Sequence, residues 1–139
     1  MRMEGFQGAV LGVKLRHLDA WNEKRRAAAT LYAKALSNTP LITPAHEADG
    51  TYHVHHVYVC RAPQRDRLRA HLTEQGIGTG IHYLIPTHKQ PLWLERFGEH
   101  APLPVSEKLA EEAISLPMFP EITSDEVDFV AEKIAEFYG

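Results

Sequence analysis

Apolar residues recur at helical spacing through the first 37 residues of the chain, and neither glycine nor proline occurs from 13 to 37. Two apolar stripes run along the first half of this segment: Leu11, Leu15 and Leu18 form one, and Phe6, Val10, Val13 and Trp21 form the other. A helix that is apolar on two sides is normally buried on two sides. The pattern therefore predicts one long helix over residues 1–37 that packs against something outside its own small domain.

Strand and helix patterns alternate over the rest of the chain. A β-branched and aromatic run predicts a strand over residues 51–61, and bulky residues at alternate positions predict a second strand from Ile77 to Tyr83. Thr123 is expected to begin the last helix, with Glu126 three residues later completing a capping box. The remaining predicted elements are helices at 63–75, 92–97 and 104–114 and a short extended piece at 115–120.

This order of elements predicts an α+β fold. We expect a small antiparallel or mixed sheet of three strands with helices packed on one face, preceded by the long N-terminal helix. A length of 139 residues is typical of a single domain. That domain is expected to consist of the helix at 1–37 and a sheet-and-helix core at 51–139.

The composition is that of a globular protein and excludes several classes. With 44% hydrophobic and 24% charged residues the chain is not wholly disordered. Its one cysteine, Cys60, excludes an internal disulfide framework and suggests the reducing cytoplasm. The sequence contains neither an apolar run of membrane-spanning length nor a signal-peptide pattern, so we expect no membrane partner. A net charge of −3 without a long basic block argues against a nucleic-acid partner.

Six of the nine histidines lie between His53 and His88, which raises the question of a metal site. His53 and His55 share one face of the predicted strand while His56 points the other way, and no metal-ligand spacing such as Cys-x-x-Cys is present. Hydrogen-bonded histidines are therefore favoured over metal ligands. Cys60 ends an apolar strand and is expected to be a core residue rather than a nucleophile.

A better candidate site lies where the second predicted strand ends. His82 and Tyr83 end that strand, His88 follows in the next loop, and Gly78 and Gly80 leave room on the His82 face for a ligand or another backbone. Histidine can transfer protons near neutral pH, and tyrosine can donate a hydrogen bond to a phosphate or sugar oxygen. From spacing alone, ligand binding and a purely structural role in the loop are equally favoured.

No lysine has the surroundings of a Schiff-base lysine, which must be desolvated and supported by its neighbours. Five lysines fall at charged helical positions, and Lys89 lies in a proline-bounded loop without a preceding phosphate-binding sequence. The six are Lys14, Lys24, Lys34, Lys89, Lys108 and Lys133.

Several segments, in order and at compatible spacing, carry a resemblance to one family. They are RMEGFQGAVL at 2–11, HVHHVYV at 53–59, GIGTGIHY at 76–83, IPTHKQ at 85–90 and LPMFP at 116–120. Together they resemble the C-terminal part of the DegT/DnrJ/EryC1/StrS aminotransferases, pyridoxal-phosphate enzymes that aminate keto-sugars attached to nucleotides. The resemblance spans nearly the whole chain and implies the small domain of a fold-type I aminotransferase.

The resemblance also implies which active-site groups lie in this chain and which lie in a large domain outside it. In the family a large N-terminal domain supplies the Schiff-base lysine, the aspartate facing the pyridine nitrogen and most phosphate contacts. We therefore expect no catalytic residue and no bound cofactor in this chain alone, with pyridoxal phosphate belonging to the full-length family. The resemblance places Arg2 at the edge of the active site facing anionic groups, His82 and Tyr83 at its mouth, and His88 near the nucleotide-sugar.

Three hypotheses follow. The chain is a detached small domain of a sugar aminotransferase that is inactive alone, half of a split enzyme completed by a separate large-domain chain, or a non-catalytic module for ligand binding or oligomerisation. In each case the apolar stripes within residues 1–21 would be exposed on the isolated chain, and exposed patches of that kind drive association. We expect a homo-oligomer or a large-domain partner to bind through residues 1–21, and a nucleotide-sugar to be the ligand.

Overall fold

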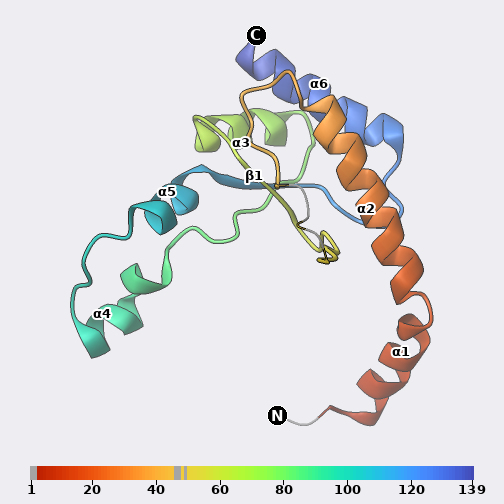
Figure 1. Ribbon diagram of the computed structural model, residues 1–139, viewed down its shortest axis with the longest axis horizontal. Coiled ribbons are helices and arrows are strands. Elements are labelled where there is room, and N and C mark those ends of the chain that lie inside the picture. The colour runs from red at the N-terminus through yellow and green to blue at the C-terminus, as the bar shows by residue number, and fades with distance from the viewer. Residues whose placement is uncertain (1–2, 46–47, 49) are drawn as a thin grey trace.

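The computed structural model describes residues 3–45, 48 and 50–139 (Figure 1). Within them the chain forms an α+β fold with six α-helices, one short 3-10 helix and a sheet of two antiparallel strands. In chain order the elements are α1 (Gly5–Leu15), α2 (Leu18–Ala35), β1 (Tyr58–Arg61), α3 (Arg65–Glu74), η1 (Thr87–Lys89), α4 (Pro91–Phe97), α5 (Pro104–Glu112), β2 (Ala113–Leu116) and α6 (Ser124–Tyr138).

The sheet packs one face against the helices. Tyr58 pairs with Leu116 and Cys60 pairs with Ile114. Alternate residues of a strand point to the same face, so these four side chains lie together, in a buried cluster that α2, α3 and α6 complete. Figure 1 shows α3 and α6 on the same side of the strands. Cys60 is a core residue, as predicted, and burial raises the pKa of its thiol to about 12.

Two buried polar side chains tie the layers together. Tyr32 of α2 stacks on Tyr58 with ring centroids 5.0 Å apart, and its hydroxyl donates to the carbonyl oxygen of Pro117 at 3.0 Å. Arg65 of α3 donates from Nη1 to the carbonyl oxygens of Ala110 and Ala113, at 3.1 and 3.0 Å. Because buried polar groups are costly when unpaired, the two bonds from Arg65 fix how α3 packs against the junction of α5 and β2.

The prediction of one long N-terminal helix is wrong. The helix breaks after Leu15, and α2 begins at Leu18. At the break the amides of Arg16 and His17 donate to carbonyls three residues back, at 3.4 and 3.0 Å, which closes a tight turn. None of the described residues of α1 is buried, so no packing holds it in line with α2.

Among the described residues, the sheet has two strands and not the predicted three. The segment expected as a strand over 77–83 forms only a single bridge, in which Gly80 and Ser115 exchange hydrogen bonds at 3.0 and 2.8 Å. The turn at His82 and Tyr83 then carries the chain away from β2. The pairing therefore stops after one residue.

The remaining strands differ in extent from the predicted ones. Only Tyr58–Arg61 of the strand expected over 51–61 is paired as β1, and His55 upstream has a φ of 45°, which breaks an extended chain. The extended piece expected at 115–120 lies earlier, as β2 at Ala113–Leu116. The helical pattern predicted over 104–114 would include Ala113 and Ile114. These two residues join β2 instead, because all four residues of the strand are buried there.

The helix starts follow the local signals closely. The capping box of α6 is confirmed: Thr123 Oγ1 accepts from the Glu126 amide at 3.3 Å, and Glu126 Oε2 accepts from the Thr123 amide at 2.8 Å. Pro91 and Pro104 open α4 and α5. Among the described residues, none of the helices is both long and apolar enough to cross a membrane.

Leu68 tests the packing of α3 against the core. Its side chain is fully buried, whereas Leu31 on α2 is 40% exposed. We expect Leu68→Ala to lower the free energy of unfolding by about 2–5 kcal/mol, because it leaves a cavity as well as losing buried apolar surface. Urea denaturation followed by circular dichroism measures the change. Leu31→Ala is the control, and an equal effect of both substitutions would contradict this core.

Candidate functional site

The candidate site lies on an arm that leaves the sheet and returns to it. The arm runs from Ile81 to Glu112 and carries η1, α4 and α5, and it extends away from the core (Figure 1). It starts beside β2, because Gly80 pairs with Ser115, and it ends where α5 leads directly into β2. The core therefore determines where both ends of the arm lie.

The arm lines an open cavity of about 410 Å³. Three of the four predicted site residues line it, namely His82, Tyr83 and His88. Arg2, the fourth, is outside the described residues. The structure thus brings together a strand-end pair and a loop residue that the sequence could only place near one another along the chain.

His82 is held against the sheet. Its Nδ1 lies 2.8 Å from Ser115 Oγ of β2. The imidazole ring also lies over Gly80, where a Cβ would come within 2.9 Å of His82 Cε1. The absence of a side chain at Gly80 therefore makes room for the ring of His82 itself, and not for the ligand or second backbone that the glycine spacing suggested. Tyr83 beside it is 77% exposed and free to meet a ligand from solution.

His88 is held by a carboxylate that the sequence analysis did not single out. Its Nε2 lies 3.1 Å from Glu107 Oε1 on α5, and the ring is only 6% exposed. Lys89 Nζ lies 2.8 Å from the other oxygen, Oε2, and the Leu103 amide donates to Oε1 at 3.1 Å. The one sequence signal for Glu107 is its place in the first turn of a helix opened by proline, where acidic residues are favoured.

These three hydrogen bonds set the charge of Glu107. The bond from Lys89, followed by those from His88 and the Leu103 amide, lowers the pKa of the carboxyl from 4.5 to about 2. Hydrogen bonds to the charged form favour it, so Glu107 is ionised at neutral pH. It therefore joins η1 to α5 with a negative charge beside the cavity.

Two further cavity residues, Trp93 and His100, were also missed from the sequence. The His100 ring centroid lies 5.9 Å from that of His88 and 6.5 Å from that of Trp93, both in edge-on arrangements. Trp93 lies in the short helix α4 and His100 in the loop after it, and neither segment is long enough for a periodic pattern to indicate which side chains turn inward. Their rings add aromatic surface of the kind that packs against sugars and bases.

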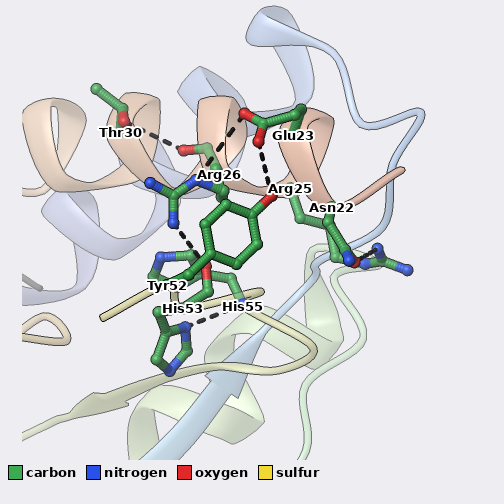
Figure 2. Close-up of polar contacts among 8 residues, drawn as sticks. All are labelled: Asn22, Glu23, Arg25, Arg26, Thr30, Tyr52, His53 and His55. Carbon is green, nitrogen blue, oxygen red and sulfur yellow. Dashed lines mark hydrogen bonds and ion pairs between the residues drawn. The ribbon is translucent and has the colours of Figure 1, made fainter. Parts of the chain in front are cut away.

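A second polar cluster fastens the loop before β1 to α2 (Figure 2). Arg26 Nη1 donates to the His53 carbonyl oxygen at 3.0 Å, and its guanidinium lies 4.3 Å from the centroid of the Tyr52 ring. The Tyr52 hydroxyl donates to Glu23 Oε1 at 2.6 Å, and this bond raises the pKa of the tyrosine. The cluster clamps the loop onto the helix.

The histidines of that loop do not share a strand face as predicted. His53 and His55 lie outside β1, with ring centroids 4.1 Å apart, and the His55 amide donates to His53 Nδ1 at 2.9 Å. Among the described residues, no group of three or more histidine, cysteine or acidic side chains is arranged to hold a metal ion.

With the geometry in place, the chain can be compared with known proteins. The model of the DegT/DnrJ/EryC1/StrS aminotransferase family matches residues 1–135. The chain belongs to this family. Over 139 residues it is 47% identical to a pleiotropic regulatory protein of Geobacillus stearothermophilus, with 99% of this chain and 37% of the relative covered.

One curated relative and one solved structure from Streptomyces venezuelae carry more specific descriptions. The dTDP-3-amino-3,4,6-trideoxy-alpha-D-glucose transaminase of Streptomyces venezuelae is 35% identical over 136 residues, covering 98% of this chain and 36% of that protein. The crystal structure of S. venezuelae DesV with a ketimine intermediate superimposes with a TM-score of 0.86 at 34% identity, covering 94% of this chain and 35% of that one. The chain thus spans about a third of the length of the relatives that it matches.

The family depends on pyridoxal phosphate, which a Schiff-base lysine holds covalently. A Schiff-base lysine needs a lowered pKa and a desolvated amine. Five of the six lysines are exposed. The sixth, Lys133, lies 2.7 Å from Glu136 and 3.2 Å from Glu132, which raise its pKa. The described lysines therefore do not fit covalent attachment of the cofactor.

The lowered pKa of Glu107 makes a prediction about acid stability. A carboxyl whose pKa is lower in the folded than in the unfolded chain stabilises the fold above the unfolded value and loses that contribution as the pH falls through the folded value. We expect the stability difference between the natural chain and Glu107→Ala to shrink as the pH falls from 4.5 to about 2. Urea titrations at several pH values measure it. Glu111→Ala, an exposed position on the same helix, is the control, and a difference that stays constant over this pH range would contradict the assignment.

Proposed function

We propose that this chain forms the C-terminal small domain of a nucleotide-sugar aminotransferase and supplies the lid side of its substrate cleft. The observation that carries the proposal is the cavity in which His82, Tyr83 and His88 meet, on a chain that belongs to an aminotransferase family. Two of its relatives are described as transaminases of dTDP-linked amino sugars, which supports a nucleotide-sugar as the ligand.

Each cavity residue has a distinct part in binding. Tyr83, exposed at the mouth, donates a hydrogen bond to a phosphate or sugar oxygen. His82, fixed by Ser115, presents an imidazole that does not need to be ordered when the ligand arrives. His88 contacts the ligand from the inner wall, and Arg2 pairs with its anionic groups. Apolar and aromatic neighbours such as Trp93 exclude water around them.

Amino transfer itself requires a Schiff-base lysine that these 139 residues do not supply. The exposed or ion-paired state of the lysines supports this assignment, because neither environment desolvates the amine as a Schiff-base lysine requires. The chain by itself is therefore a binding and lid element, and pyridoxal phosphate is attached through a large domain.

Association through the N-terminal helices belongs to the same proposal. Phe6 and Leu15 of α1 are 80% and 68% exposed, and none of the described residues of that helix is buried. Burying such surface is favourable at about 25 cal/mol per Å². A second copy of the chain or a large-domain partner covers α1 and the start of α2, within residues 1–21.

Binding is tested by titrating the chain with dTDP-glucose and following histidine and tyrosine side chains by NMR. We expect the signals of His82, Tyr83 and His88 to shift and that of His71 to stay unchanged. His71 lies on α3 outside the cavity, where its Nε2 is hydrogen-bonded to the Lys133 carbonyl oxygen of α6. Shifts at none of the three, or equal shifts at His71, would contradict the site.

The absence of a Schiff-base lysine is tested by incubating the chain with pyridoxal phosphate, reducing it with borohydride and measuring its mass. Stoichiometric labelling of one lysine would contradict the proposal that a large domain supplies this lysine.

Association is tested by adding charge to α1. The double variant Phe6→Glu and Leu15→Glu should shift sedimentation toward the monomer, since both side chains are exposed and the change costs little folding energy. Phe129→Glu on α6, at 43% exposure, is the matched control. A natural chain that sediments as a monomer at high concentration would argue against the interface.

A further inference from the structure

Glu107 holds the imidazole of His88 in place at the wall of the cavity. His88 Nε2 lies 3.1 Å from Glu107 Oε1, in a ring that is almost completely buried. The carboxylate is itself held at two points, by Lys89 Nζ at 2.8 Å and by the Leu103 amide at 3.1 Å. The position of Glu107 is therefore set independently of His88, and the histidine must adapt to it.

An ionised carboxylate can only accept hydrogen bonds. Nε2 of His88 therefore carries the hydrogen, and in the neutral imidazole the other nitrogen, Nδ1, is then an acceptor with a free lone pair. Among the described residues, no hydrogen bond is made to His88 Nδ1, although His88 lines the cavity. His88 Nδ1 can therefore accept a hydrogen bond from a group that enters the cavity.

We infer that Glu107 is a positioning residue that locks His88 in the Nε2–H tautomer, so that Nδ1 accepts a hydrogen bond from a hydroxyl or ammonium group of the ligand. The inference that the ligand is a nucleotide-sugar rests on the function proposed above. A phosphate or carboxylate oxygen is an acceptor only and cannot pair with a neutral Nδ1. His88 therefore contacts the sugar end of the ligand rather than its diphosphate.

The first test needs no ligand. In 15N-labelled protein at about pH 8, above the range in which histidine ordinarily titrates, long-range 1H–15N spectra distinguish the two imidazole tautomers. We expect His88 to be a single Nε2–H tautomer in the natural chain and a mixture in Glu107→Ala. Lys89→Ala, which removes only the outer contact of Glu107, should leave the tautomer unchanged. A natural chain with the hydrogen on Nδ1 overturns the inference even if Glu107→Ala does not fold.

The second test separates the two ends of the ligand. Affinities for dTDP-glucose and for dTDP, measured by calorimetry, should differ in their response to Glu107→Ala. We expect about tenfold weaker binding of dTDP-glucose, the effect of losing one oriented hydrogen bond, and no change for dTDP. Glu111→Ala is the charge-matched control and should affect neither. Circular dichroism confirms that each variant is folded.

The outcomes distinguish this inference from the proposed function. Equal weakening of dTDP and dTDP-glucose would show that His88 does not contact the sugar, and would overturn the ligand assignment here while leaving a nucleotide-binding site. A locked tautomer in a protein that binds neither compound would support the role of Glu107 and contradict the proposed nucleotide-sugar function.

Discussion

The candidate site depends on Ser115, which interacts through both its backbone and its side chain. Its amide and carbonyl exchange hydrogen bonds with Gly80 at 2.8 and 3.0 Å, and its hydroxyl lies 2.8 Å from His82 Nδ1. Every residue of β2 is buried, and Ile114 and Leu116 on either side of Ser115 belong to the core. Ser115 cannot shift without disturbing that packing. The position of the first cavity histidine is therefore a property of the hydrophobic core.

The far wall of the cavity is held by different forces. Arg65 anchors the base of α5 through two backbone carbonyls, but beyond that point the arm has few buried apolar residues. Glu107 and its three hydrogen-bond donors hold η1 against α5. Charge-assisted hydrogen bonds are directional, whereas apolar contacts are not. One wall of the cavity is positioned by the hydrophobic core through Ser115, and the other by the carboxylate of Glu107. The arm can therefore hold polar side chains in fixed orientations although it buries few apolar residues.

Helix α1, unlike the cavity, is not held by the core. The apolar residues of α1 contact no core, and the helix bends away from α2 at Arg16 and His17. Helices draw most of their stability from the packing of an apolar face. Helix α1 leaves its apolar residues uncovered, which is the observation behind the association proposed above. The clamp of Arg26 on the Tyr52 and His53 loop shows that α2, by contrast, is well integrated.

The sequence by itself determined the features that depend on neighbouring residues. The α+β class, the helix starts at Pro104 and Thr123, the core position of Cys60 and the grouping of His82, Tyr83 and His88 were all predicted from local spacing. Capping, turn chemistry and alternation act over a few residues, so they can be interpreted without knowing the fold.

The tertiary structure decided what depends on contacts between distant segments. Whether 77–83 becomes a strand depends on how far it can follow β2, and whether the first helix stays straight depends on what packs against it. The contact of His88 with Glu107 joins residues 19 positions apart on different elements, which no periodicity could indicate. Hydrogen bonds and burial across the fold compete with local propensity, and at these places they outweigh it.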